Sequence, residues 1–331
     1  MEELLVTGRH NELIDPALGI WTWEVAMYLF LGGLTAGVMV FSAAMLLLGK
    51  EREAPFASFR LALLAPIVLS LGMTTLFLDL EHKLHVYRFY TAFEITSPMS
   101  WGAWILVVIY PVSILQIAST LRSGWPIAAA LVDVTNPGRR FLDWCEQRQG
   151  AIAMVAIPFA IALGIYTGIL LSAFGARPFW NSGVLGPLFL VSGMSTAAAL
   201  VALVARQRSE KELFTKLDIV LIVAELALVA LFIVNLATGS SQHIEALDSV
   251  IGGSYTFVFW VLFVGVGLLI PLLLELLEIS GINRRLAVLA PVLVLVGGYV
   301  LRQVMIDAGQ ESTWTSYPTQ YNAELFERLG R

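Results

Sequence analysis

Residues 20–48 read IWTWEVAMYLFLGGLTAGVMVFSAAMLLL and contain a single charged side chain, Glu24. An α-helix needs about 20 mostly apolar residues to cross the hydrocarbon core of a bilayer. The stretch is too long for the apolar region of a signal peptide, and the preceding residues 1–19 are acidic rather than basic. It therefore predicts a transmembrane helix that is retained in the protein.

Further segments of the same character follow along the chain, which has 331 residues, 58% of them hydrophobic and only 14% charged. Soluble domains average about 25% charged residues. The sequence predicts an all-α polytopic membrane protein with eight transmembrane helices. The segments after the first are residues 58–80, 101–121, 151–174, 184–205, 217–238, 255–279 and 285–306.

Charge and cysteine content exclude several classes of protein. The net charge of −5 excludes an electrostatic nucleic-acid binder. A single cysteine, Cys145, cannot form an internal disulfide, a cysteine zinc site or an iron–sulfur cluster. The four histidines, His10, His82, His85 and His243, all lie outside the predicted spans. We therefore expect no haem held between membrane helices and no metal centre in this protein.

The distribution of basic residues predicts the orientation in the membrane. Of the 20 Lys and Arg residues, 13 lie in the odd-numbered connections between spans or at the span ends that border them. Because Lys and Arg concentrate on the cytoplasmic side, both termini are expected on the outer side of a bacterial or archaeal inner membrane. The expected outer tails are residues 1–19 and 307–331.

A faint internal repeat suggests two halves. The sequence LFLGG at residues 29–33 is echoed by LFLVS at 188–192, and small residues follow both. The two stretches lie at matching depths in the first and fifth spans. We expect two four-helix bundles in the same orientation, formed by residues 20–174 and 184–306.

Aromatic and polar residues gather in the even-numbered connections. Residues 79–88 read DLEHKLHVYR and include Asp79, His82 and His85, and residues 94–104 read EITSPMSWGAW. The sequence therefore predicts a site at the outer face of the membrane.

Ionisable residues also occur inside the predicted spans, where they are costly and commonly functional. Glu225 falls about seven residues, or roughly 10 Å, into the sixth span. Glu275 lies near the cytoplasmic end of the seventh span and Arg302 near the outer end of the eighth. Their depth suggests a proton path from the cytoplasm through the second half of the protein.

Four motifs resemble the membrane-subunit family of polysulfide reductase and formate-dependent nitrite reductase (PsrC/NrfD). They are WTWE at 21–24 with the glycines at 32, 33 and 37, TSPMSWGAW at 96–104, YTG at 166–168 and RPFWN at 177–181. The resemblance implies a quinone-reactive subunit of a respiratory oxidoreductase. Such a subunit exchanges electrons between menaquinone or ubiquinone and an iron–sulfur subunit docked on the outer face. Through that subunit it serves a catalytic subunit, typically a molybdopterin enzyme.

The resemblance also implies site residues. In the family a tyrosine of the fourth span binds a quinone oxygen, and Tyr166 matches it. A relative carries Asn and His where this sequence has Val25 and Tyr28, so the second hydrogen bond is expected from a neighbouring polar group. The residues expected at the site are Glu24, Tyr28, His82 and His85 for hydrogen bonds, Asp79 for proton relay, Trp23, Trp101 and Trp104 around the ring, and Arg177.

Two other classes stay open at this point. A secondary transporter would also have many spans, a repeat and buried carboxylates, but its unusual residues would lie near the midplane rather than at one face. A passive anchor that only ties soluble subunits to the membrane would need neither Tyr166 nor Glu24.

Overall fold

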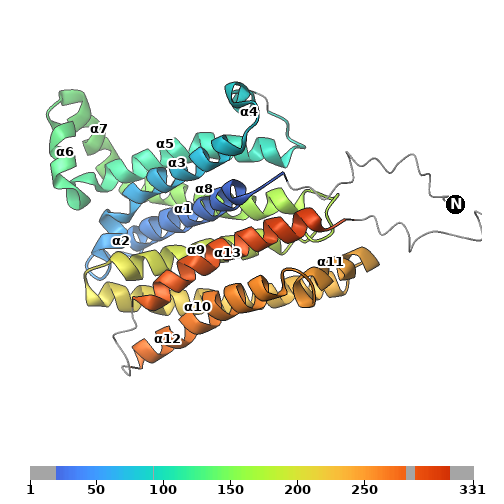
Figure 1. The fold of residues 1–331 in the computed structure, drawn as a ribbon. Helices are drawn as coiled ribbons and strands as arrows, with labels where there is room; N and C mark the ends of the chain where they lie inside the picture. The colour runs from blue at the N-terminus through green and yellow to red at the C-terminus, as the bar shows by residue number, and fades with distance from the viewer. Residues whose placement is uncertain (1–19, 92, 281–287, 314–331) are drawn as a thin grey trace, which may run out of the picture.

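The computed structural model describes residues 20–91, 93–280 and 288–313. All regular structure in these residues is helical, and eight helices are long and apolar enough to cross a membrane (Figure 1). The predicted fold class and number of spans are therefore confirmed. The tail 1–19, the connection that holds Arg284 and Arg285, and residues 314–331 lie outside the described residues.

Long helices form the bundle, and short helices lie at its ends. The long ones are α1 (Trp23–Leu47), α3 (Leu64–Asp79, extended by the 3₁₀ turn η2, Leu61–Leu63), α5 (Pro98–Gly124), α8 (Gln149–Ser172), α9 (Leu185–Val204), α10 (Arg208–Ala237), the π-helical η4 (Phe257–Leu269) continued by α12 (Ile270–Ile279), and α13 (Leu289–Glu311). The short ones are α2 (Pro55–Phe59), η3 (Lys83–His85), α4 (Arg88–Thr91), α6 (Pro126–Asp133), α7 (Asn136–Gln147) and α11 (Ser241–Ile251).

Two predicted boundaries were wrong. Helix α10 begins at Arg208 rather than at residue 217, because its charged first turns continue the helix beyond the apolar span. Glu210 in these turns accepts hydrogen bonds from the backbone N–H groups of Phe56 (3.2 Å) and Ala57 (2.7 Å), which have no partner within helix α2. Helix α13 continues to Glu311, so the predicted tail from residue 307 starts too early.

Helix α1 is the centre of the bundle. It is buried along most of its length and packs against α3, α8, α9 and α13. Glycines allow a close approach between α1 and α9. A Cβ atom on Gly193 would lie 2.5 Å from the carbonyl oxygen of Gly33. Close backbone contact of this kind is how small residues hold membrane helices together.

The predicted division into two four-helix halves stays a prediction. Helices α3 and α8 pack against α1, α5 packs against α8, and α10 and α13 pack against α9. Helix α9 also packs against α1 and α8, so the two groups share a continuous interior.

The two ends of the bundle differ. One end carries α6 and α7 and is called here the hairpin end; the other carries α4, α11, the start of α1 and the end of α13, and is called the pocket end (Figure 1). Both limits of the described residues, 20 and 313, therefore lie at the pocket end.

The α1–α9 crossing generates a stability prediction. We expect Gly193→Ala to destabilise the folded protein by about 1–3 kcal/mol, because the added methyl group must push α1 and α9 apart. Thermal unfolding in detergent micelles measures the effect. The control is Gly150→Ala, a helical position whose Cβ would have no neighbour within 4 Å. Equal unfolding midpoints for the two variants would contradict the packing argument.

Candidate functional site

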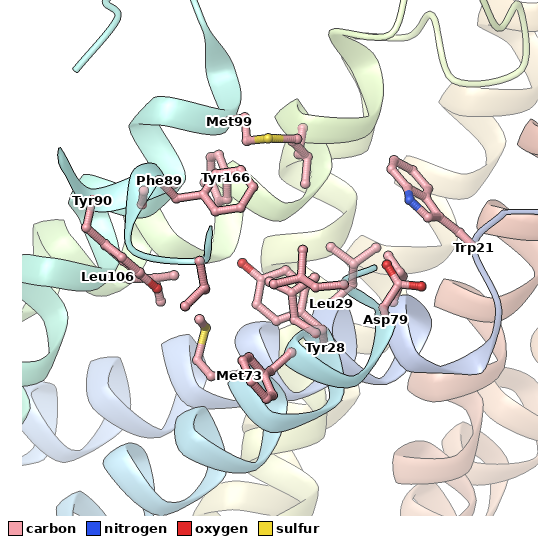
Figure 2. Close-up of a pocket in the computed structure, with 18 of the residues that line it drawn as sticks. Trp21, Tyr28, Leu29, Met73, Asp79, Phe89, Tyr90, Met99, Leu106 and Tyr166 are labelled. Carbon is pink, nitrogen blue, oxygen red and sulfur yellow. The ribbon is translucent and has the colours of Figure 1, made fainter. Parts of the chain in front are cut away.

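A cavity of about 450 Å³ lies at the pocket end, between α1, α3, α4, α5 and α8 (Figure 2). Its wall is mainly aliphatic, aromatic and methionine side chains. The polar groups in the wall are the phenols of Tyr28, Tyr90 and Tyr166, the carboxylate of Asp79 and the indole of Trp21. A largely apolar cavity with a few polar groups is typical of a site for an organic ligand.

Tyr28 and Tyr166 bring hydroxyl groups into the cavity from different helices. Both side chains are buried, and the phenol of Tyr28 lies close enough to Tyr166 and Tyr90 to interact electrostatically (Figure 2). Within the described residues neither the Tyr28 nor the Tyr166 hydroxyl has a hydrogen-bond partner, so each is available to a ligand.

Gly102 on α5 makes the space that Tyr166 occupies. A Cβ atom at residue 102 would overlap the Tyr166 ring. This close contact gives the WGAW sequence around Gly102 a physical role, because any side chain there would displace the tyrosine of α8.

The cavity reaches the outer surface of the bundle. Its wall includes Phe77 of α3, Phe89 of α4 and Met99 of α5, and all three side chains are exposed. Helices α3 and α5 have few contacts with each other. A lipophilic ligand can therefore enter from the bilayer between these helices.

Trp21 was not among the predicted site residues, but it lines the cavity and connects it to α13. Its ring stacks on Trp180 with the centroids 5.5 Å apart. Its backbone N–H donates to Gln310 Oε1 (2.8 Å), and Gln310 Nε2 donates to its carbonyl oxygen (2.7 Å). The position of this wall therefore depends on the last helix.

Tyr90, Phe89 and Met73 were also missed. Burial raises the pKa of Tyr90, which keeps its hydroxyl protonated and able to donate. Val86, Phe89 and Tyr90 line the cavity because the connection after α3 folds back as η3 and α4. The only signal in the sequence is that this connection carries aromatic residues next to the predicted histidines.

The three predicted tryptophans lie outside the cavity wall. Trp23 is exposed on the first turn of α1. Trp101 donates from Nε1 to the carbonyl oxygen of Ile95 (2.7 Å), and the Trp104 ring meets Phe93 edge-on at 5.6 Å. These two tryptophans therefore fix the connection before α5 rather than contact the cavity.

The other predicted polar residues lie near the mouth or beyond it. Asp79 lines the cavity, and the Glu24 carboxylate, which accepts a hydrogen bond from the Thr22 hydroxyl, lies close enough to interact with it. His82 and His85 are exposed, with ring centroids 6.1 Å apart, and neither lines the cavity.

Arg177 belongs to the packing between the α8–α9 connection and the end of α13. The side chain is buried and donates from Nη1 to the carbonyl oxygen of Ser312 (2.8 Å). It does not line the cavity.

A second buried polar region lies among α9, α10 and α13. Arg302 is fully buried. It donates to Ser192 Oγ (2.5 Å) and to the carbonyl oxygens of Gly298 and Phe189 (both 2.9 Å). Glu225 is buried beside it and interacts with both Arg302 and Ser192.

Further acidic groups continue this region towards the hairpin end. Ser195 donates to Asp218 Oδ1 (2.5 Å), and Asp218 interacts with Glu275. Both Glu275 oxygens and one oxygen each of Asp218 and Glu225 are buried without a hydrogen-bond partner among the described residues. Buried polar atoms of this kind are commonly satisfied by water or by a shared proton.

A polar cavity of about 270 Å³ lies at the hairpin end of the same region. Its wall includes Lys211, Thr215 and Glu278. Thr215 is one turn before Asp218, and Glu278 interacts with Glu275. In residues 20–91, 93–280 and 288–313, no group of three or more His, Cys, Asp or Glu side chains is placed to hold a metal.

The contact between Gly102 and Tyr166 is testable by a double-mutant cycle. We expect Gly102→Ala to destabilise the protein, because the new methyl group overlaps the Tyr166 ring. In a Tyr166→Ala background the new methyl group fits without overlap. The change in the free energy of unfolding of the double variant should therefore differ from the sum of the two single changes by about 0.5–3 kcal/mol. Thermal unfolding of the four proteins measures this coupling. Additive effects would mean that the two residues do not meet.

Comparison with known proteins gives the family. The family model "Polysulphide reductase, NrfD" matches residues 9–312. Protein NrfD of Escherichia coli K12 is 31% identical over 316 residues, which cover 88% of this sequence and 95% of that protein. A polysulfide reductase polypeptide of Wolinella succinogenes is 27% identical, and the match covers 88% of this sequence and 94% of that protein. A selenate reductase polypeptide of Mesobacillus selenatarsenatis is 23% identical, and the match covers 87% of this sequence and 72% of that protein.

The matches extend over nearly all of the described residues, including the second half, for which the motifs gave no support beyond the number of spans. They confirm the resemblance that the motifs of the first half indicated. This chain is a membrane protein of the NrfD/polysulphide reductase family.

Proposed function

We propose that this protein is the quinone-reactive membrane subunit of a respiratory oxidoreductase complex. The observation that carries the proposal is the largely apolar cavity at the pocket end. It reaches the surface of the bundle at Phe77, Phe89 and Met99, and two helices bring to it hydroxyls that have no hydrogen-bond partner among the described residues. The relatives support the wider assignment, because two of them are named as parts of polysulfide and selenate reductases.

The residues of the cavity fit a quinone. A quinone has an apolar ring and tail and two carbonyl oxygens, and it supplies two-electron, two-proton chemistry when bound. Aromatic and methionine side chains such as Met73 and Phe77 match the ring and tail. In this proposal the hydroxyls of Tyr28 and Tyr166 donate hydrogen bonds to the two oxygens. The second hydrogen bond, for which Glu24, Tyr28 and the histidines were all candidates, therefore comes from Tyr28.

Proton exchange with the outside uses the acidic mouth of the cavity. Asp79 lies in the wall, and Glu24 lies next to it at the surface. His82 and His85 are exposed on the following connection. Because histidine side chains commonly act as proton shuttles, this group is suited to pass protons between Asp79 and bulk water.

Electrons reach the cavity through a partner. We propose that an iron–sulfur subunit docks on the pocket end and links it to a catalytic subunit of the molybdopterin class. Large apolar side chains project from this end: Leu84 is 89% exposed and Ile95 is 68% exposed. A docked protein would cover them. The excess of basic residues at the opposite end supports placing the pocket end on the outer side of the membrane.

Removing one hydroxyl tests the quinone site. We expect Tyr166→Phe to lower kcat/KM for quinone by about tenfold or more in the assembled complex, since a hydrogen bond to the reacting oxygen is lost. Steady-state turnover with a soluble quinone analogue measures it. Tyr110→Phe is the matched control, because the Tyr110 hydroxyl contacts Ser70 (3.1 Å) and does not line the cavity. Normal turnover by Tyr166→Phe would favour a passive anchor instead.

The second polar region favours an additional role, proton translocation coupled to quinone chemistry. Glu278, Glu275, Asp218, Glu225 and Arg302 form a series from the polar cavity at the hairpin end into the interior. Charged groups at this depth are costly in a membrane, and their unpaired oxygens leave places for protons and water. We propose that this series carries protons towards the pocket end.

Replacing Glu225 tests the path. We expect Glu225→Gln to lower the number of protons translocated per electron in proteoliposomes while quinone turnover continues. Glu245→Gln, on an exposed position of α11, is the control and should leave the ratio unchanged. An unchanged ratio in Glu225→Gln would remove this residue from any proton path.

A further inference from the structure

Helices α6 and α7 form a hairpin that lies across the bundle axis rather than along it (Figure 1). They contain 8 and 12 residues, too few for a helix to span the hydrocarbon core. The hairpin projects sideways from the junction of α5 and α8. The hairpin is therefore not one of the transmembrane helices, and its exposed surface needs a separate explanation.

The hairpin exposes large apolar side chains in helical register. On α6 and its C-terminal cap, Ile127, Leu131 and Val134 follow an i, i+4, i+7 spacing and are 83%, 74% and 79% exposed. Residues with this spacing share one face of a helix. Such a face is unfavourable in water unless something apolar covers it.

The exposed face of α7 combines aromatic rings with arginines. Phe141, Trp144 and Arg148 follow an i, i+3, i+7 spacing, and Arg140 lies one turn before Trp144. The Arg148 guanidinium lies 4.9 Å from the centre of the Trp144 ring. The opposite face, with Leu142 and Cys145, is buried.

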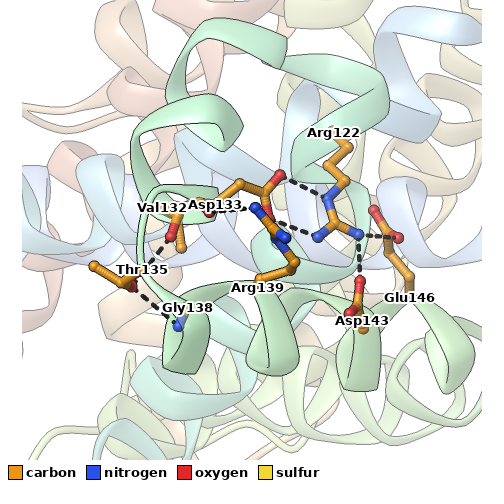
Figure 3. A network of polar contacts seen from close by, with 8 residues as sticks. All are labelled: Arg122, Val132, Asp133, Thr135, Gly138, Arg139, Asp143 and Glu146. Atoms are coloured by element: carbon orange, nitrogen blue, oxygen red, sulfur yellow. Dashed lines mark hydrogen bonds and ion pairs between the residues drawn. The ribbon is translucent and has the colours of Figure 1, made fainter.

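An ion-pair network fixes the hairpin and occupies its acidic groups. Arg122, near the end of α5, pairs with Asp133 (2.6 Å), Asp143 (2.8 Å) and Glu146 (2.8 Å), as Figure 3 shows. These are the three carboxylates of residues 125–148. The hydrogen bonds from Arg122 hold the pKa of Asp133 below its usual range, which favours the ionised, paired form of this carboxyl.

The arrangement separates charge on the hairpin. Its carboxylates face inwards on Arg122, while Arg140 and Arg148 pair with no carboxylate in the part of the protein that the structure describes. The outward face of α7 therefore presents positive charge next to aromatic rings, and α6 adds an aliphatic stripe.

We propose that the α6–α7 hairpin lies in the headgroup layer of the bilayer and binds anionic phospholipid through Arg140 and Arg148. The aliphatic residues of α6 fit the upper acyl region, and Trp144 fits the interface where tryptophan is enriched. Basic residues at this level attract anionic headgroups. The inference is independent of the quinone cavity, which lies at the other end of the bundle.

Native mass spectrometry tests the lipid specificity. The full-length protein is reconstituted in nanodiscs of equal phosphatidylglycerol and phosphatidylcholine, and the lipids that stay bound on release are counted. We expect the double variant Arg140→Gln/Arg148→Gln to lose about tenfold in its preference for phosphatidylglycerol. The matched control is Arg208→Gln, an exposed arginine that pairs with Glu212 (2.8 Å). Equal preference in the double variant and the wild-type protein would overturn the proposal.

Tryptophan quenching tests the position of the hairpin by a second route. In nanodiscs of lipid brominated near the top of the acyl tails, we expect the fluorescence difference between wild-type protein and Trp144→Phe to fall by about half or more, because bromine quenches by contact. The same lipid without bromine is the control. An unquenched Trp144 would overturn the proposal and indicate a soluble protein partner on this face. Unchanged thermal unfolding midpoints show that the substituted proteins remain folded.

Discussion

The crossing of α1 and α9 is the contact on which the other features depend. Gly33 and Gly193 let the two backbones meet, and Gly33 also leaves space for the Arg302 guanidinium, whose Nη2 would lie 3.2 Å from a Cβ at that position. The same small residues therefore bring the two helix groups together and admit a buried charge between them. Helix α1 can then present Tyr28 to the cavity on one side and Gly33 to α9 and α13 on the other.

Much of the fold follows from the sequence because each span is a continuous apolar run that can be read without knowing its neighbours. The two boundary errors arose where a helix continues past its apolar part, at Arg208 and at Glu311. Those turns are stabilised by partners far away in the sequence, such as the amides of Phe56 and Ala57 on Glu210. Apolar periodicity carries no information about such partners.

The site was predictable to the extent that its residues lie on the long helices. Tyr166, Tyr28 and Asp79 were expected and line the cavity. Tyr90 depends instead on how the connection between α3 and α5 folds back. Trp101 and Trp104 flank the wall residues Gly102 and Ala103 in the sequence, but their rings contact the connection before α5. The contacts of Arg302 could not be predicted, because its neighbours Ser192 and Glu225 lie on other helices.

The pairing of Trp21 with Gln310 has a consequence for the order in which the protein is built. Trp21 precedes the first helix and Gln310 lies in the last turn of α13, so 289 positions separate the two partners in the sequence. A nascent polypeptide inserted from its N-terminus contains α1, α3, α5 and α8 long before it contains Gln310. One wall of the cavity therefore reaches its final position only after α13 has been synthesised, which delays ligand binding until that helix has packed against the start of α1.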